Sequence, residues 1–241
     1  MHMIDVHCHI LYRVDDASQR STESLDMLKV AAADGVKVIA ATSHIKPPMY
    51  ENTKADLQEA LENVQALIDA NHLDIEVILG AENFLNHKSM HLLDEDGFVT
   101  YGDNGKYMLV EFAWTKNAMD KPTSYLQRII DKGYIPVVAH PERYQWVHED
   151  YELVRLWRKM GCLMQVNRTS VLQLDKMQKA NEFATRLLED DLVDCIATDS
   201  HAPYAPRLPK LSDVYTYISK HYGEAKAKSY LIDVPQQIIS K

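Results

Sequence analysis

The fold of this 241-residue chain is constrained most by a repeated feature: one apolar, strand-like segment after another ends on a side chain of the kind that binds metal ions. Segments with helical periodicity lie between them, and this alternation is typical of parallel strands with helices packed outside. In closed barrels of this type, the reactive side chains lie at the carboxyl ends of the strands. The six segments that end in this way are 3–9, 36–44, 75–82, 107–111, 135–140 and 193–201.

A seventh strand-like segment, residues 162–166, completes the repeat, and helical patterns such as that of residues 54–70 separate the segments. Ser21 or Thr22 is in position to cap the helix that follows the first segment. The sequence therefore predicts one α/β barrel domain over residues 1–241. Three glycines stand where a helix needs a left-handed residue before the next strand, namely Gly35, Gly133 and Gly161.

Composition narrows the class of protein further. The hydrophobic fraction of 46% suits a packed globular domain. No apolar run reaches the roughly 18 residues that a spanning helix needs, and the first residues lack the basic and apolar segments of a secretion signal. We therefore expect a cytoplasmic protein without membrane insertion. The three cysteines (Cys8, Cys162 and Cys195) lie in or beside apolar segments, which fits buried free thiols in a reducing compartment.

The charge balance argues against one class of partner. Acidic residues outnumber basic residues by 35 to 26, which gives a net charge of −9. A protein that binds nucleic acid in general needs positive charge to offset the phosphates, so we expect no nucleic acid among the partners. Bound cations would cover several of the excess carboxylates.

Imidazoles and carboxylates at the ends of these segments form a candidate metal-binding set. His7 and His9 are two residues apart, a spacing that places both side chains on one face of a strand, and Asp199 and His201 repeat it. For any one such residue alone, a structural histidine or a salt-bridged carboxylate is the commoner role. The whole set is His7, His9, Asp16, His44, Glu82, Glu111, His140, Asp199 and His201.

The loop after the first segment contains two adjacent aspartates, and spacing alone does not decide between them. We favour Asp16 as the ligand and Asp15 as an acceptor for the loop backbone. One ion takes about four to six ligands, so nine groups suit two or three divalent ions. Mixed imidazole and carboxylate ligands fit Mn, Fe or Zn and do not suit a calcium site built from oxygens only.

Clustered cations of this kind lower the pKa of bound water and hold a phosphoryl group, so the sequence predicts metal-dependent phosphate hydrolysis. We expect a hydroxide that bridges two ions to attack the phosphorus. Arg143 and Arg207 are candidates to bind the phosphate oxygens, and Glu142 is a candidate to hold Arg143 in place. Protonated His201 or water is a candidate to give a proton to the leaving group.

A second phosphatase motif is present only in spacing. Cys162 and Arg168 have the Cys-x5-Arg spacing of thiol-based tyrosine phosphatases. That chemistry needs backbone N–H groups wrapped around the phosphate, whereas the five residues between them are strand-like and contain no glycine. We therefore reject the thiol mechanism.

The chain resembles the PHP (polymerase and histidinol phosphatase) superfamily and, more narrowly, the manganese-dependent bacterial protein tyrosine phosphatases of capsule and exopolysaccharide loci, the CpsB group. The resemblance extends from the first strand to the last. His-Pro-Glu-Arg and the short Val-Asp-Asp loop are its more specific motifs. The matching segments are residues 4–10, 14–16, 41–44, 80–82, 109–112, 136–143, 165–167 and 196–201.

This resemblance implies a distorted (β/α)7 TIM-like barrel, the PHP fold, with three bound metals. It implies that the nine residues of the set are metal ligands, with Asp16 rather than Asp15, and that Arg143 and Arg207 hold phosphate. The implied activity is removal of phosphate from phosphotyrosine in protein. The implied partner is the tyrosine-rich C-terminal tail of a bacterial tyrosine kinase that regulates polysaccharide export.

Two other functions remain open from the sequence. One is a small-molecule phosphatase on the same scaffold, such as histidinol phosphatase, which the length and the full ligand set permit. The other is a non-catalytic, metal-stabilised module that only binds a kinase, although a degenerate module would be expected to lack ligands that this chain retains. The loop of residues 46–50 follows His44 directly and is expected to form a wall of the site.

Overall fold

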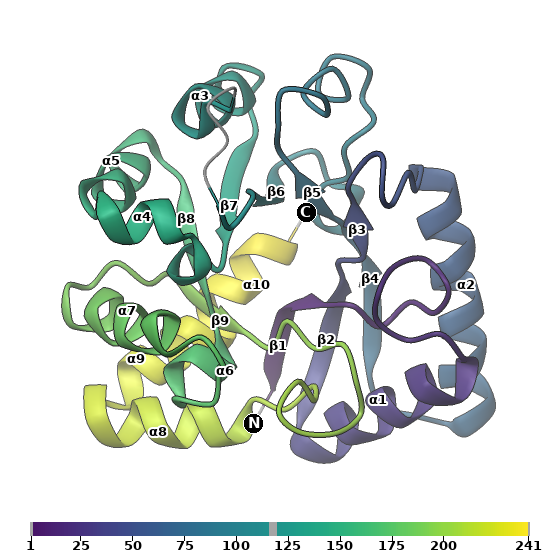
Figure 1. Ribbon diagram of the computed structural model, residues 1–241. Coiled ribbons are helices and arrows are strands. Elements are labelled where there is room, and N and C mark those ends of the chain that lie inside the picture. Colours follow the sequence, from purple (N-terminus) through teal and green to yellow (C-terminus); the bar gives the residue numbers. More distant parts are fainter. Residues whose placement is uncertain (1, 116–119, 241) are drawn as a thin grey trace.

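The computed structural model describes residues 2–115 and 120–240, in which parallel strands form a ring and helices cover its outside (Figure 1). The strands are β1 (Met3–Cys8), β2 (Val36–Ala41), β3 (His44–Ile45), β4 (Glu76–Leu79), β5 (Glu82–Phe84), β6 (Tyr107–Glu111), β7 (Ile135–Ala139), β8 (Leu163–Asn167) and β9 (Cys195–Ala197).

The helices follow the strands in alternation, as the sequence predicts. The α-helices are α1 (Ser21–Asp34), α2 (Lys54–Asn71), α3 (Pro122–Asp131), α4 (Gln145–Glu149), α5 (Glu152–Met160), α6 (Arg168–Val171), α7 (Gln178–Glu189), α8 (Ser212–Tyr222), α9 (Glu224–Lys228) and α10 (Val234–Ile239). Short turns of other helix types are η1 (Tyr101–Asp103), η2 (Pro141–Arg143) and η3 (Ser229–Asp233). Among the described residues, no helix combines the length and the apolar character that crossing a bilayer requires.

The nine strands trace the seven predicted segments, because two of those segments are each broken in the middle. β2 lies in the second segment and β3 begins at its last residue, His44; β4 lies in the third segment and β5 begins at its last residue, Glu82. Hydrogen bonding forms one sheet in the order β1-β2-β4 and a second in the order β3-β5-β6-β7-β8-β9, with every pair parallel. A parallel bridge between Cys8 and Ser200 joins β1 to the end of β9 and closes the ring. The predicted distorted (β/α)7 barrel is therefore confirmed.

The break between β4 and β5 is a place of close backbone approach. A side chain at Gly80 would put its Cβ 3.2 Å from Thr42 Cγ2 and 3.3 Å from the carbonyl oxygen of Ala41. Beyond the break, the backbone N–H of Glu82 is shared between the carbonyl oxygens of Thr42 and Ser43 at 3.1 and 3.2 Å. The chain thus moves from one sheet to the other just where the candidate ligands begin.

The amino end of the ring is filled by apolar side chains. Ile4 and Val6 of β1 pack with residues of the other strands, and Ile238 of α10 packs into the same cluster. Tyr101 donates a hydrogen bond to the carbonyl oxygen of Val6 at 2.9 Å. Helix α10 crosses this end of the ring, as Figure 1 shows in yellow. We call this cluster the interior plug, and its buried members are Ile4, Val6, Ala40, Tyr101, Tyr107, Leu109, Val137, Ala139, Cys195, Ala197 and Ile238.

The predicted helix ends are correct, but one predicted helix start is wrong. Gly35, Gly133 and Gly161 all have the expected left-handed backbone, with φ of 92°, 92° and 101°. Neither Ser21 nor Thr22 caps α1, because the helix begins one residue earlier than that prediction requires, with Arg20 at the N-cap. The Glu23 carboxylate instead accepts a hydrogen bond from the backbone N–H of Gln19 at 2.8 Å. Gln19 lies outside the helix, so this bond fixes the chain before α1, and the N-cap itself has no side-chain hydrogen bond.

Candidate metal centre

The nine predicted ligands all lie at the carboxyl end of the strand ring, opposite the interior plug. Seven of them line a cleft of about 370 Å³ whose walls also include Arg143 and Arg207, and His7 and His9 lie buried next to Glu82. His7 and His9 form the floor and have no exposed surface, whereas the Asp16 side chain is 50% exposed and stands at the rim. The structure therefore brings together the whole set that the sequence predicts, from six separate strand ends and one loop.

A register shift in β1 allows its two histidines to reach the site. The pairing of β1 with β2 shifts between Asp5 and Cys8. Val6 packs in the interior plug, and the next residue, His7, belongs to the candidate ligand cluster. In a regular strand, successive side chains point to opposite faces, so both could not point into the ring without this irregularity. Two candidate ligands also have left-handed backbone, with φ of 32° at His140 and 49° at Asp199. Such conformations occur at functional sites where the surrounding structure enforces them.

Hydrogen bonds fix which nitrogen of His9 faces the cleft. The Asp15 carboxylate accepts from Nδ1 of His9 at 2.8 Å, so Nδ1 carries the proton and Nε2 presents a lone pair. Asp15 also accepts from the backbone N–H of Ala17 at 3.1 Å and of His44 at 3.2 Å. Asp15 is therefore the loop acceptor behind the ligands, the role that the sequence favours for it.

A chain of amides fixes His7 in the same way. The Asp199 carboxylate can only accept, so the side-chain NH₂ of Asn167 donates to it at 2.8 Å. The Asn167 carbonyl oxygen then accepts from the NH₂ of Gln165 at 2.9 Å, which leaves the Gln165 carbonyl oxygen facing Nδ1 of His7 at 2.8 Å. His7 therefore carries its proton on Nδ1, and its Nε2 lone pair points into the site.

The two lone pairs thus produced lie very close together, which tests whether the residues fit a bound metal. Nε2 of His7 and Nε2 of His9 are 3.2 Å apart. Two nitrogen lone pairs at this distance repel each other unless positive charge lies beside them. Among the described residues, Nδ1 of His140 is a buried nitrogen without a hydrogen-bond partner, and so is Nδ1 of His44, which lies 3.1 Å from Glu82. This donor set fits cations.

Glu82 stands at the centre of the cluster. One of its oxygens, Oε2, lies 3.3 Å from Nε2 of His9, 3.5 Å from Nε2 of His7 and 3.1 Å from Nδ1 of His44. The other oxygen, Oε1, accepts from Nε2 of His140 at 2.9 Å. A carboxylate in this position is suited to contact more than one ion.

The ligand atoms fall into three overlapping groups, within each of which all ligand atoms lie within 4.8 Å of one another. The shared members are His9, His44 and Glu82. His140 and Asp199 adjoin these groups through Glu82 and through the two floor histidines. The groups are His9 with Asp16, His44 and His201; His7 with His9 and Glu82; and His44 with Glu82 and Glu111.

The electrostatics of the cluster favour positive charge within it. Burial raises the pKa of Glu82, but His7 and His44 outweigh burial and hold the pKa of Glu82 well below its usual range. Burial likewise opposes charge on His9, yet Asp15 and Glu82 raise the pKa of His9 well above its usual range. His201 differs, because burial and the nearby His9 lower its pKa to about 4. A neutral His201 has a lone pair that a cation could take, and its role as proton donor to the leaving group stays a prediction.

Both predicted phosphate-binding arginines reach the cleft, and both contact Asp199. Arg143 is buried and donates from Nη1 to Asp199 Oδ2 at 3.0 Å. Arg207 donates from Nη2 to Asp199 Oδ1 at 2.8 Å, and its side chain is 35% exposed. The arginines therefore lie next to the ligands, where phosphate oxygens held by cations would meet them.

Two contributing residues were missed by the sequence analysis, and one predicted role is wrong. Glu142 does not hold Arg143, because its carboxylate accepts from the backbone N–H of Asn167 at 2.9 Å. Asp175 holds Arg143 instead, accepting from Nε at 3.0 Å and from Nη2 at 2.6 Å. Lys46 lies 2.9 Å from Glu111 at the mouth of the cleft. Lys46 was part of the predicted wall loop, but no sequence pattern marks Asp175.

The thiol motif is confirmed to be accidental. Cys162 lies directly before β8, is buried, and has a pKa that burial raises to about 12. Arg168 binds the Asp213 carboxylate, with Nε at 2.9 Å and Nη2 at 2.6 Å. The two residues therefore do not form a phosphate-binding loop.

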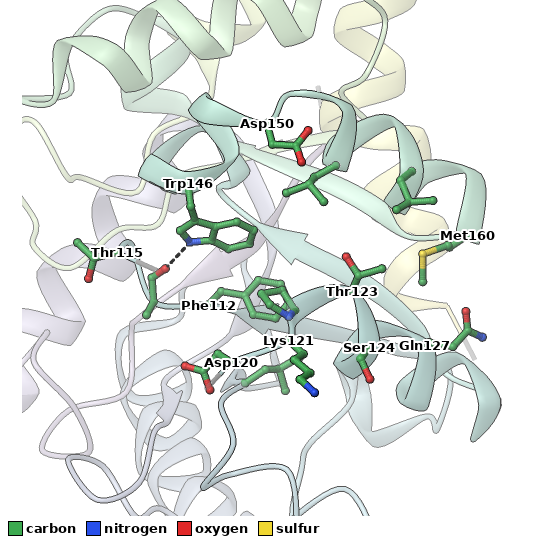
Figure 2. Close-up of a pocket in the computed structure, with 15 residues that line it drawn as sticks. Phe112, Thr115, Asp120, Lys121, Thr123, Ser124, Gln127, Trp146, Asp150 and Met160 are labelled. Carbon is green, nitrogen blue, oxygen red and sulfur yellow. Dashed lines mark hydrogen bonds between the residues drawn. The ribbon is translucent and has the colours of Figure 1, made fainter. Parts of the chain in front are cut away.

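A larger cavity of about 790 Å³ lies behind one wall of the cleft (Figure 2). Phe112 and Ala113 line both spaces, and Trp146 donates a hydrogen bond to the Ala113 carbonyl oxygen at 2.9 Å. Its remaining walls come from α3, α4 and α5 and include Leu156. None of the nine candidate ligands lines it, so size alone does not identify the reactive site of this molecule.

Comparison with known proteins was made on sequence and on structure. A family model described as capsular polysaccharide synthesis, CpsB/CapC, matches residues 3–240. The tyrosine-protein phosphatase CpsB of Streptococcus pneumoniae is 32% identical over 241 residues, which are 98% of each chain. The tyrosine-protein phosphatase YwqE of Bacillus subtilis strain 168 is 31% identical over 204 residues, 83% of this chain and 77% of that protein.

The solved structures include a match of the same kind. It comes from a study of YwqE from Bacillus subtilis and CpsB from Streptococcus pneumoniae, described there as unique metal-dependent tyrosine phosphatases. The superposition has a TM-score of 0.82 at 26% identity and covers 98% of this chain and 91% of the other. Both comparisons agree with the fold and with the class of enzyme that the sequence predicts.

Proposed function

This chain belongs to the CpsB/CapC family of capsular polysaccharide synthesis, and on that premise we propose that it is a metal-dependent tyrosine-protein phosphatase. One observation carries the proposal. Seven imidazole and carboxylate groups line one cleft together with two arginines, and the buried His7 and His9 adjoin them through Glu82. Members of the family that have this activity, CpsB and YwqE, match the chain over most or nearly all of its length.

The cofactor proposed is two to three divalent ions, manganese in the first place, with iron or zinc as alternatives. When bound, such ions lower the pKa of water and neutralise charge on phosphate oxygens. The proposed ligands are the nine residues of the predicted set. The single barrel over residues 1–241 is proposed to hold them as one domain.

The protein's own part in catalysis is to hold these groups in place before substrate arrives. Asp15 fixes the ring of His9, and Gln165 with Asn167 fixes the ring of His7, so neither histidine needs to reorient. Asp175 holds Arg143 on the wall of the cleft, where its guanidinium can meet the phosphate. Arg207 is partly exposed, and its Nη2 donates to the Asp199 carboxylate. We expect this Nη2 group to turn from Asp199 to an incoming phosphate.

The substrate proposed is phosphotyrosine in protein, removed from the C-terminal tail of a bacterial tyrosine kinase in the control of polysaccharide synthesis. The shape of the site supports a protein substrate, because the cleft opens at the rim where Asp16 and Trp114 are exposed. An extended tail can bring a side chain to such a rim without unfolding of either protein. This work would take place in the cytoplasm, where the kinase tail lies.

The proposal is tested by a substrate panel with metal removal and return. Chelation should abolish turnover of para-nitrophenyl phosphate and of a phosphotyrosine peptide, and manganese should restore both. Histidinol phosphate should be a poor substrate in the same panel. Slow turnover of phosphotyrosine beside rapid turnover of histidinol phosphate would contradict the proposal and favour the small-molecule phosphatase.

A further inference from the structure

A second cavity, of about 500 Å³, opens directly beside the metal cleft. The two spaces share Trp114, Arg143 and Arg207 as walls, so a molecule that enters one borders the other. Its volume falls within the range of cavities that accept a ligand or a large side chain. We call this space the flank pocket, and its lining residues beyond the shared three are Thr169, Leu174, Asp175, Lys176, Met177 and Pro206.

The wall of the flank pocket is fixed by hydrogen bonds. Leu174 donates from its backbone N–H to the Thr169 carbonyl oxygen at 2.7 Å, and Met177 donates to the Asp175 carboxylate at 2.9 Å. That same carboxylate holds Arg143 at 2.6 Å. The segment 174–177 therefore forms part of the pocket wall and also holds Arg143, the arginine proposed to bind phosphate. A change in this segment is expected to affect both spaces.

Two exposed apolar side chains line the mouth of this pocket. Leu174 is 46% exposed and Trp114 is 44% exposed, and both line the flank pocket. The other large apolar side chains with similar exposure among the described residues do not line the flank pocket: Met49 and Tyr204 lie in the loops after β3 and β9, and Leu156 lines the cavity of Figure 2. Apolar surface gathered at one place marks a binding surface more often than chance exposure does.

We propose that the flank pocket binds an aliphatic side chain of the substrate that lies within two residues of the phosphotyrosine. The inference rests on the proposed function, since it assigns a specificity pocket to the same site. Leu174, Met177 and the Trp114 ring supply apolar contact, and the shared arginines place that contact next to the phosphate. A small phosphomonoester fills the cleft alone, so the pocket selects a polypeptide over a free metabolite.

The size of the expected preference follows from the area that such a side chain loses to solvent. Burying about half of a leucine side chain favours binding by roughly tenfold. Phosphotyrosine peptides with leucine at one flanking position should therefore have a kcat/KM about tenfold above otherwise identical peptides with serine there. Scanning the two positions on each side of the phosphotyrosine identifies the position that the pocket reads.

The variant that tests the pocket is Leu174→Asp, with Leu174→Ser as a milder second change. Each should lower the ratio of kcat/KM for the leucine peptide to kcat/KM for para-nitrophenyl phosphate by about tenfold. Leu156→Asp is the matched control, because Leu156 is similarly exposed at 43% but lies outside the flank pocket. That control should keep the wild-type ratio.

The outcomes separate this inference from the proposed function. If metal-loaded protein fails to hydrolyse para-nitrophenyl phosphate, the proposed function fails. If it hydrolyses that substrate but shows no leucine preference, or if Leu174→Asp keeps the preference, the flank pocket inference is overturned. A change in oligomeric state of Leu174→Asp on gel filtration, with the preference intact, would assign the surface to a second copy of the chain and would equally overturn it.

Discussion

The two ends of the strand ring use the same strands but are filled in opposite ways. At the amino end, the interior plug brings Ile4, Val6 and Ile238 into a closed apolar cluster. At the carboxyl end, the same strands supply imidazoles and carboxylates, with Nε2 of His7 and Nε2 of His9 only 3.2 Å apart. The apolar end needs no bound group for its stability, because its side chains pack against one another. The polar end carries unpaired lone pairs and is complete only with positive charge present.

This contrast assigns the two ends different tasks. The interior plug contributes to the free energy of folding, whereas the metal centre is expected to lower stability without ions and to supply the chemistry with them. Changes at the carboxyl end should therefore alter activity with little effect on the fold of the barrel. Changes in the interior plug should lower stability with little effect on activity.

The largest effect is expected from removing a floor ligand. His9→Ala removes a lone pair that belongs to two of the three ligand groups. Turnover of para-nitrophenyl phosphate should fall by more than about a thousandfold, because charge stabilisation worth several kcal/mol is lost with the ions. Circular dichroism should still show a folded barrel. Activity within tenfold of wild type would contradict this account, because the carboxyl end would then catalyse the reaction without His9.

A smaller effect is expected from the amides behind the ligands. Gln165→Leu keeps the size of the side chain but removes the acceptor for Nδ1 of His7. The manganese concentration that gives half-maximal activity should rise by roughly 10- to 100-fold, and excess manganese should recover most of the turnover. Gln58→Leu, on the exposed face of α2, is the control. An unchanged metal titration for Gln165→Leu would show that the amide chain does not position His7.

At the apolar end, Ile238→Ala should change stability rather than activity. Ile238 is fully buried in the interior plug, so the truncation should lower the free energy of unfolding by roughly 2–5 kcal/mol. Urea unfolding of metal-free protein measures this, and turnover with saturating manganese should match wild type. A large loss of turnover with unchanged stability would mean that the two ends are not separate.

The smallest effect is expected at Cys162. Burial raises the pKa of this thiol to about 12, so it stays protonated and unreactive between pH 6 and pH 9. Cys162→Ser should retain full metal-dependent activity, and iodoacetamide at pH 8 should not inhibit the wild type. Complete loss of activity in Cys162→Ser would restore the thiol mechanism and remove the metal centre from its role.

Much of the fold and the candidate ligand set was predictable because the sequence shows both the hydrophobic periodicity of each segment and the position of polar residues at the segment ends. Alternating segments define parallel strands, and a polar residue at the end of each strand must lie at one rim of the ring. The spacing of His7 and His9 indicated one shared face, and the structure has both rings on the cluster floor. The choice of Asp16 over Asp15 came from the resemblance, and their hydrogen bonds and exposure now fit it.

What the sequence did not reveal depends on contacts between distant segments. Asp175 meets Arg143 only because the segment between α6 and α7 reaches the side of the cleft, and nothing in its neighbours signals this. The register shift in β1 likewise depends on pairing with β2. The start of α1 was misplaced because the helix begins at Ser21, with Arg20 at the N-cap and no side chain capping it. Each of these outcomes was decided by tertiary geometry rather than by local preference.

The most direct test of the central claim, that cations complete the polar end, is the metal content of protein purified without chelator. Elemental analysis should find about two to three transition-metal ions per chain, and Ile238→Ala should contain the same number. His9→Ala should retain at most about one, because two ligand groups lose a member. Fully active protein with less than about one ion per chain, or His9→Ala with its full metal content and activity, would contradict the account.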